Sequence, residues 1–331
     1  MPEPLLSVRG LCKYFPVMSK GFLKKKIGEV RASDQISFDL KRGETLGLVG
    51  ESGCGKTTTG RSILRALDPT SGEVLFESQS GPVDLAKLAS GELKPLRTRM
   101  QMIFQDPFSS LNPRMTVGTI VREPLDIHGI GSMKEREEKV AHMLERVGLK
   151  PAHRSRYPHA FSGGQRQRIG IARALIMHPE LVVCDEAVSA LDVSVQAQVI
   201  NLLQDLQKEL GLTYIFIAHD LSVVKHICDR IAVMYAGRIV ELATTEQLFE
   251  DPKHPYTKAL LSAVPNPDPD KPMNMSLSGE VADPGNLPDG CAFHPRCSVC
   301  LDHCDIQVPE LMPLDDGRTV ACHNDLKQEE I

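Results

Sequence analysis

Short apolar runs alternate with helix-like segments along most of the chain. Runs of strand length occur at residues 5–8, 35–40, 45–49, 74–76, 100–104, 181–184, 214–217 and 231–234. Several intervening stretches, such as residues 58–67, are compatible with helices. The alternation predicts an α/β fold in which helices cover a mostly parallel sheet. We expect the first few strands to form an antiparallel side sheet.

Two departures from this alternation predict the domain organisation. Residues 133–147 and 163–177 both have helical spacing, so the interval of about 123–177 is predicted to be a helical subdomain inserted into the α/β core. After residue 263 the proline-rich run 264–272 predicts a stiff linker, which a cysteine-rich tail follows. We therefore expect a core domain over residues 1–263 and a C-terminal extension over residues 264–331.

Composition narrows the class of protein. A chain of 331 residues with 41% hydrophobic content can bury one large core and a smaller second unit. The net charge of −5 gives no overall basic surface, so we expect no nucleic-acid partner. The apolar runs are far shorter than the roughly 20 residues of a membrane-spanning helix, and residues 1–4 do not resemble a secretory signal. We expect a cytosolic chain whose nine cysteines are thiols or metal ligands rather than disulfides.

A glycine-rich loop follows the predicted strand 45–49. This phosphate loop, residues 50–57, reads Gly-Glu-Ser-Gly-Cys-Gly-Lys-Thr and has the full G-x-x-x-x-G-K-T pattern between a strand and a helix. Its backbone N–H groups can surround an anion, Lys56 adds positive charge at the outer phosphates, and Thr57 offers a hydroxyl to Mg²⁺. We predict a nucleoside triphosphate site. The expected contacts are Gly50, Ser52, Gly53, Cys54, Gly55, Lys56, Thr57 and Thr58.

Two carboxylates follow the apolar run 181–184. Asp185 is expected at the carboxyl end of a buried strand, where ligands collect in open α/β sheets. Asp185 is predicted to hold Mg²⁺ through water, and Glu186 to polarise the water that attacks the terminal phosphate.

Residues 161–165, here called the signature loop, form a second candidate anion site. The loop opens a predicted helix with a hydroxyl and two glycines, so N–H groups and the helix dipole both favour an anion. One chain has a single phosphate loop, and a second phosphate site therefore indicates two subunits that face each other. The expected contacts are Ser162, Gly163, Gly164 and Gln165.

Together these motifs resemble those of ABC-type ATPase subunits, with Phe161 replacing the usual leucine of the L-S-G-G-Q signature. The resemblance implies that Gln105 meets Mg²⁺ and the transport partner, and that His219 contacts the γ-phosphate. It also implies that Asp192 couples two subunits. Phe15 resembles the aromatic residue that stacks on adenine, with a core aromatic residue as the alternative.

One departure bears on activity, because Ala187 replaces the proline that usually follows the catalytic glutamate. Both carboxylates remain, so we predict a site that hydrolyses ATP.

The tail indicates a branch of the family. Its residues 290–297, together with Cys304 and the pair Cys322-His323, resemble the C-terminal extension of oligopeptide/dipeptide permease ATP-binding subunits. With residues 106–113 and 188–194, the match extends over nearly the whole chain and is similar to the F-type ATPase of these importers. The resemblance implies a heterodimer with a related D-type subunit, two transmembrane permease subunits and an extracytoplasmic binding protein. It implies a peripheral position on the cytoplasmic face of the membrane.

Four cysteines of the tail are candidate metal ligands: Cys291, Cys297, Cys304 and Cys322. Their loose spacing suits a [4Fe–4S] cluster better than zinc, and related permease ATPases imply the same. Zinc stays open because Cys297 and Cys300 form a C-x-x-C pair and three histidines, His294, His303 and His323, lie nearby in the sequence. A third alternative is that the thiols pack as small apolar side chains.

The predicted function is ATP hydrolysis that powers import of di- and oligopeptides through a membrane permease. The same role in an importer of oligosaccharides, glutathione or nickel chelates remains an alternative, because the cargo passes through other chains. A soluble ABC-type ATPase that acts mechanically without a permease is a different class. Such proteins normally carry a long coiled-coil insertion or two cassettes, and neither is visible here. A small-molecule kinase with the same phosphate loop would leave the signature loop unexplained.

Overall fold

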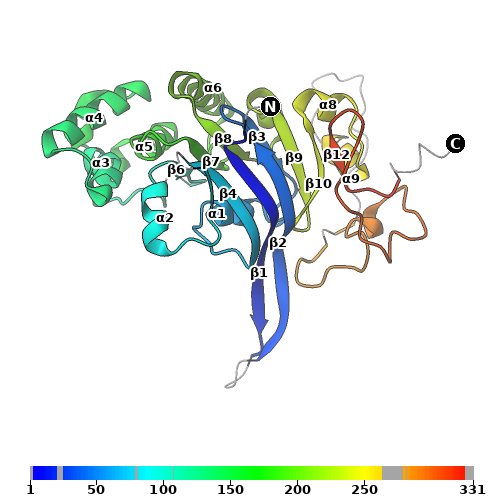
Figure 1. Ribbon diagram of the computed structural model, residues 1–331. Coiled ribbons are helices and arrows are strands. Elements are labelled where there is room, and N and C mark those ends of the chain that lie inside the picture. Colours follow the sequence, from blue (N-terminus) through cyan, green and yellow to red (C-terminus); the bar gives the residue numbers. More distant parts are fainter. Residues whose placement is uncertain are drawn as a thin grey trace, which may run out of the picture. The chain divides into compact units, whose positions relative to one another are not determined.

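The computed structural model describes residues 3–20, 25–78, 81–106, 108–262, 279–280 and 282–324 (Figure 1). These residues form two compact units. The first unit contains residues up to 40, residues 45–87 and residues from 218 onward, and the second contains residues 41–44 and 88–217. The predicted linker 264–272 lies outside the described residues.

An antiparallel sheet belongs to the first unit and has the strand order β2-β1-β4-β5. Its strands are β1 (Leu6–Met18), β2 (Lys26–Leu40), β4 (Ser71–Ser78) and β5 (Gly81–Asp84). Strands β1 and β2 form the long ribbon in Figure 1, pairing from Leu6 opposite Leu40 to Met18 opposite Lys26. The predicted antiparallel side sheet is confirmed. Strand β1 continues well beyond the predicted residues 5–8, and its last four residues are exposed.

A second sheet of the first unit has the order β11-β12-β10-β9-β3. Its strands are β3 (Thr45–Val49), β9 (Arg230–Tyr235), β10 (Arg238–Thr244), β11 (Met312–Pro313) and β12 (Thr319–Val320). Strands β3 and β9 are parallel, whereas β9, β10, β12 and β11 pair antiparallel in turn. The C-terminal extension thus supplies the outermost strands of this sheet. The helices of this unit are α1 (Lys56–Ile63), α7 (Leu221–Ile227), α8 (Thr245–Glu250) and α9 (Pro255–Ser262).

The second unit contains a parallel sheet in the order β8-β7-β6. Its strands are β6 (Met100–Ile103), β7 (Leu181–Asp185) and β8 (Thr213–Ile217). Its helices are α2 (Ser90–Leu96), α3 (Val117–His128), α4 (Met133–Arg146), α5 (Gly163–Leu175) and α6 (Val193–Leu210), of which α3, α4 and α5 lie together in Figure 1. Helix α4 begins at a capping box, in which the Ser132 hydroxyl accepts the Glu135 N–H and the Glu135 carboxylate accepts the Ser132 N–H.

Strands β3, β7 and β8 are buried at every residue, which explains their unbroken apolar sequences. The predicted α/β class is confirmed by these strands and the helices around them. Within the described residues, no helix is long and apolar enough to span a bilayer. Strand β3 leads directly into the phosphate loop, and β7 ends at Asp185.

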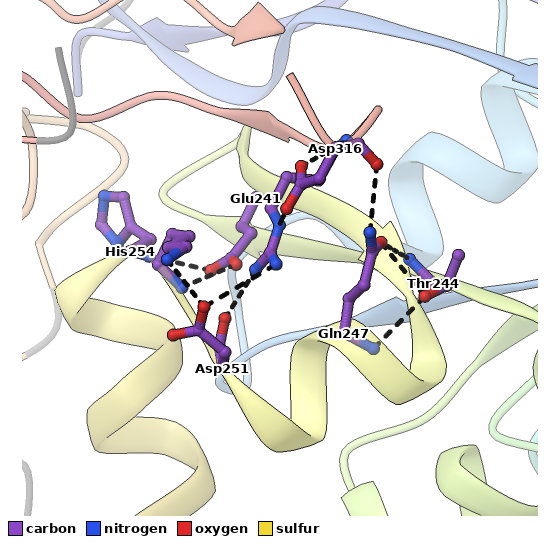
Figure 2. A network of polar contacts seen from close by, with 8 residues as sticks. Glu241, Thr244, Gln247, Asp251, His254 and Asp316 are labelled. Carbon is purple, nitrogen blue, oxygen red and sulfur yellow. Dashed lines mark hydrogen bonds and ion pairs between the residues drawn. The ribbon is translucent and has the colours of Figure 1, made fainter. Parts of the chain in front are cut away.

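Polar contacts join the C-terminal extension to the rest of the first unit (Figure 2). The Arg318 guanidinium donates from Nε to Asp316 Oδ2 at 2.6 Å and from Nη1 to the Asp251 carbonyl at 2.6 Å. Gln247 of α8 donates to the Asp316 carbonyl at 3.1 Å. The buried Glu241 carboxylate of β10 accepts the N–H groups of Lys253 and His254. The extension is therefore held by the pairing of β12 with β10 and by the contacts of Asp316 and Arg318.

His254 predicts how stability responds to acid. Its side chain is buried, its Nδ1 accepts the Tyr256 N–H at 3.0 Å, and it also has a hydrogen bond with the Ala321 backbone. Burial lowers the pKa of His254 from 6.5 to about 3, because a proton on Nδ1 would be both desolvated and opposed to an N–H donor. Between these two values the unfolded chain therefore binds a proton that the folded chain does not bind. This contribution to stability is present above pH 6.5 and is lost as pH falls towards 3.

We expect His254 to lower the free energy of unfolding by about 1.4 kcal/mol for each pH unit below the pKa of an unfolded histidine. Urea unfolding at pH 5 to 7 checks this. A His254→Asn variant should be less stable overall and should lose most of this slope. The exposed His159 supplies the control, since His159→Asn should keep the wild-type slope. Equal slopes in wild type and His254→Asn would contradict the assignment.

Candidate functional site

The phosphate loop has a backbone that only glycine can adopt at its tightest points. Gly50 and Gly55 have φ angles of +151° and +101°. A Cβ atom on Gly50 would lie 2.2 Å from the Met234 carbonyl oxygen, and one on Gly55 would lie 1.8 Å from the Ala32 carbonyl oxygen. The loop therefore packs closely against neighbouring backbone at these two glycines.

Lys56 holds the loop together from within. Its buried Nζ donates to the carbonyl oxygens of Gly50 at 2.7 Å and Glu51 at 2.9 Å, and it lies 3.7 Å from Cys54 Sγ. Burial raises the pKa of the Cys54 thiol, which therefore stays neutral beside the ammonium group. The loop thus carries a fixed positive charge where the predicted phosphates would bind. Thr57 and Thr58 lie in the first turn of α1, directly after it.

Two other predicted contacts belong to the same unit as the loop. His219 is exposed and precedes Asp220, which caps α7. Phe15 lies on β1 with 38% of its surface exposed, and Lys13 Nζ lies 5.0 Å from the centre of its ring. Because Phe15 is exposed, the alternative of a core aromatic residue is wrong. An exposed ring is what stacking on a base requires.

The second unit brings together two of the predicted catalytic residues. Gln105 Nε2 donates to Glu186 Oε2 at 2.7 Å. Glu186 has a φ angle of +47°, and its backbone is anchored because its N–H donates to the Ile217 carbonyl and its carbonyl accepts the Ser189 hydroxyl. Asp185 precedes it as the buried last residue of β7. The backbone contacts of Glu186 therefore fix where its side chain starts, and the hydrogen bond from Gln105 holds its carboxylate.

The signature loop forms the start of α5. Ser162 is its N-cap, with Ser162 Oγ accepting the Gln165 N–H and Gln165 Oε1 accepting the Ser162 N–H. A Cβ on Gly164 would lie 2.4 Å from Val195, and one on Gly163 would lie 3.6 Å from Leu191, so the signature loop packs against the segment around Asp192. Asp192 is exposed and stands at the N-cap of α6. Phe161, in the position of the usual leucine, is buried against His153.

The predicted site residues fall into both units. The phosphate loop, Phe15 and His219 belong to the first unit, whereas Gln105, the signature loop, the two carboxylates and Asp192 belong to the second. The donor set predicted for Mg²⁺ is chemically suitable, because Thr57, Gln105 and Asp185 offer hydroxyl, amide and carboxylate oxygens.

The cysteines of the extension do not form a metal site in the described part of the chain, where no three His, Cys, Asp or Glu side chains form a group able to hold a metal ion. Cys300 interacts electrostatically with three of the predicted ligands, Cys291, Cys297 and Cys304. It therefore lies near them, although the spacing of the cysteines did not predict Cys300 as a ligand. Burial raises the pKa of Cys291 and Cys297, so both side chains are protonated thiols when no metal is bound.

Two histidines of the zinc alternative each bond a backbone carbonyl through one ring nitrogen. A ring nitrogen of His294 bonds the Cys291 carbonyl at 3.0 Å, and a ring nitrogen of His323 bonds the Gln307 carbonyl at 2.9 Å. The rings of His303 and His323 meet edge to face. In the described part of the extension, these cysteines and histidines do not gather into a group that could hold a cluster or zinc.

Sequence reasoning missed the surroundings of Glu51 within the phosphate loop. The Glu51 N–H donates to the Tyr256 hydroxyl at 2.9 Å, and the Glu51 carboxylate pairs with Arg296 of the extension. These partners lie 205 and 245 residues away in the chain, so no local pattern could have revealed them.

Comparisons with known proteins agree with this geometry. Residues 33–189 match the family described as ABC transporter, and residues 240–304 match the oligopeptide/dipeptide transporter C-terminal region. The chain is 53% identical over 325 residues to the oligopeptide transport ATP-binding protein AppF of Bacillus subtilis, covering 97% of each chain. It is 51% identical over 321 residues to the dipeptide transport ATP-binding protein DppF of Haemophilus influenzae, covering 96% of each.

Solved structures give the same family. The ATP-binding cassette MJ0796, in a dimeric post-hydrolysis state bound to ADP and phosphate, matches with a TM-score of 0.62 and 27% identity, over 72% of this chain and 98% of that one. The protein cbiO1 of Clostridium perfringens, part of the ABC transporter complex cbiONQ, matches with a TM-score of 0.63 and 28% identity, over 75% of this chain and 92% of that one. The chain belongs to the ATP-binding proteins of ABC transporters, in the branch that carries the oligopeptide/dipeptide transporter C-terminal region.

Proposed function

We propose that the chain hydrolyses ATP to power the import of di- and oligopeptides through a membrane permease complex. The observation that carries the proposal is the presence, in one chain, of a full set of ATPase motifs and the oligopeptide/dipeptide transporter extension. Relatives over nearly the whole length are named as oligopeptide and dipeptide transport ATP-binding proteins. Hydrolysis is the work of this subunit, and the peptide would pass through other chains.

In the proposed mechanism, two ATP molecules lie between two facing ATPase subunits. The backbone N–H groups of the phosphate loop and Lys56 hold the phosphates of one ATP, while the signature loop of the opposite subunit closes on its γ-phosphate. Glu186 polarises the attacking water, Gln105 keeps the Glu186 carboxylate in place, and His219 stabilises the charge that develops on the γ-phosphate. Bound Mg²⁺ would neutralise phosphate charge, with Thr57, Gln105 and Asp185 as its protein donors.

The proposal extends to the assembly. The partner ATPase is a related D-type subunit, and the two together dock on two transmembrane permease subunits that receive peptides from an extracytoplasmic binding protein. This places the chain peripherally on the cytoplasmic face of the membrane. The division into a nucleotide-binding domain over residues 1–263, with a helical subdomain over about 123–177, and an extension over residues 264–331 belongs to the same proposal.

A metal in the extension stays a prediction from the family resemblance. The geometry of the described cysteines does not support it, and no step of the mechanism uses it. Iron and zinc analysis of protein purified without oxygen decides the point, together with the broad absorbance near roughly 400 nm that a [4Fe–4S] cluster gives. Protein free of both metals would leave the cysteines as packed thiols.

The test of the function is the ATPase activity of the complex that co-purifies with the chain, reconstituted in lipid vesicles with its binding protein. The binding protein is loaded in turn with dipeptides, oligopeptides, oligosaccharides or no ligand. We expect turnover to be stimulated by the binding protein loaded with dipeptides or oligopeptides and not by the other forms. Stimulation by oligosaccharides alone would change the cargo, and recovery of the chain with ribosomes or DNA in place of permease subunits would overturn the transport assignment.

A further inference from the structure

We infer that the C-terminal extension takes part in ATP binding, because Arg296 neutralises Glu51 and positions the phosphate loop. This assigns a positioning role to a residue far from the loop in sequence. The inference rests on the proposed ATPase function and goes beyond it by giving the extension a part in the nucleotide site.

The contact between Arg296 and Glu51 is a two-pronged ion pair. Arg296 Nη1 donates to Glu51 Oε2 at 2.8 Å, and Nη2 donates to Glu51 Oε1 at 3.1 Å. The Arg296 side chain is only 4% exposed. The planar fork of arginine matches both carboxylate oxygens at once, so the pair fixes orientation as well as charge. The hydrogen bond to Glu51 raises the pKa of Arg296 above its ordinary value, which keeps the guanidinium charged.

Aromatic packing holds both ends of this pair. Phe293, buried three residues before Arg296, meets the rings of Tyr235 and Tyr256 edge to face at 5.3 and 5.4 Å between ring centres. The hydroxyl of Tyr256 accepts the Glu51 N–H at 2.9 Å. Glu51 is therefore anchored by its backbone to Tyr256 and by its carboxylate to the extension, and Phe293 packs the two anchors together.

The charge balance of the loop explains why the pair matters. Glu51 carries the only acidic side chain among residues 50–57, in a loop that is to receive several phosphate charges. An unpaired carboxylate there would repel the triphosphate and would compete with it for Lys56, which already donates to the Glu51 carbonyl. Paired with Arg296, Glu51 presents no net charge to the ligand, and Lys56 remains the charge that the phosphates meet.

The test measures the dissociation constant of a fluorescent ATP analogue for the full chain in four forms: wild type, Arg296→Gln, Glu51→Gln and the double variant. Truncating one member of a partly buried charge pair leaves the other unpaired, so we expect Arg296→Gln to weaken binding by about tenfold or more. Glu51→Gln in the Arg296→Gln background removes the unpaired carboxylate and should restore most of the affinity. An extension that only stabilises the fold would give no such rescue.

Arg318→Gln is the matched control. Arg318 lies in the same extension with 6% of its side chain exposed, and it pairs with Asp316 and Asp251 in the network of Figure 2 instead of with the loop. This variant should lose thermal stability and keep wild-type affinity for the analogue. Arg296→Lys, which keeps the charge and loses the fork, should bind with intermediate affinity and serves if Arg296→Gln does not fold.

Three results would overturn the inference while leaving the proposed function in place. The first is an affinity of Arg296→Gln within twofold of a wild type that binds the analogue, and the second is an equal loss of affinity in Arg318→Gln. The third is a double variant as weak as Arg296→Gln. A folded wild-type chain that binds no analogue would overturn the proposed ATPase function itself.

Discussion

Replacement of Glu186 by glutamine is expected to reduce ATP turnover by about 10²- to 10⁴-fold while ATP binding stays near the wild-type value. The substitution keeps the size of the side chain and removes the carboxylate that polarises water. The backbone anchors of Glu186 to Ile217 and Ser189 do not involve its side chain, so the loop should keep its position. The amide oxygen of the new side chain can still accept the hydrogen bond from Gln105.

The measurement pairs steady-state phosphate release with equilibrium binding of the fluorescent ATP analogue. Glu180→Gln is the matched control, because Glu180 precedes β7 at the end opposite Glu186 and pairs with Arg42 and Arg99. This control undergoes the same chemical change and should turn over ATP at the wild-type rate. Unchanged turnover in Glu186→Gln would remove the residue from the proposed mechanism, and loss of binding would assign it to nucleotide affinity instead.

A second large effect is expected from Gly55→Ala, which should abolish detectable ATP binding and lower the thermal unfolding temperature. The φ angle of Gly55 is +101°, and a Cβ atom would lie 1.8 Å from the Ala32 carbonyl oxygen, so backbone must move to accept it. The Gly55 carbonyl also accepts the Thr59 N–H at 2.9 Å in the first turn of α1. Any shift of Gly55 therefore moves Lys56 and the start of the helix together.

Gly53→Ala separates this close contact from the general cost of a left-handed backbone. Gly53 lies in the same loop with a φ angle of +82°, and an added Cβ there meets nothing within 4 Å. Its variant should lose about 1 to 2 kcal/mol of stability and should lose less ATP affinity than Gly55→Ala. Differential scanning fluorimetry with and without ATP compares the two variants. Similar behaviour of both would mean that the approach to Ala32 does not constrain the loop.

The sequence predicted the elements that local pattern determines. Strand β3 occupies the predicted residues 45–49, and β7 extends the predicted run by one residue to Asp185, because strands buried on both faces read as unbroken apolar runs. The phosphate loop could be recognised because its chemistry is contained in eight consecutive residues. For the same reason, the hydroxyl cap and glycines of α5 were predictable.

Features that depend on partners far along the chain could not be predicted. Strand β10 contains Glu241, a buried carboxylate that interrupts its apolar run and is accommodated by N–H groups of Lys253 and His254. The two-residue strand β12 pairs with β10, which lies more than 70 residues earlier in the chain, and with β11. The spacing of the cysteines likewise predicted four other cysteines as metal ligands and not Cys300. The fold nevertheless brings Cys300 into contact with Cys304.

The pairing of β12 with β10 has a consequence for synthesis of the chain. Strand β10 is complete at Thr244, but its edge partner at Thr319 leaves the ribosome much later. Because the ribosome adds roughly 5–20 residues per second, the backbone groups of this edge stay unpaired for several seconds. An unpaired strand edge can recruit another chain. The newborn core is therefore open to misassembly throughout the interval between synthesis of β10 and synthesis of β12.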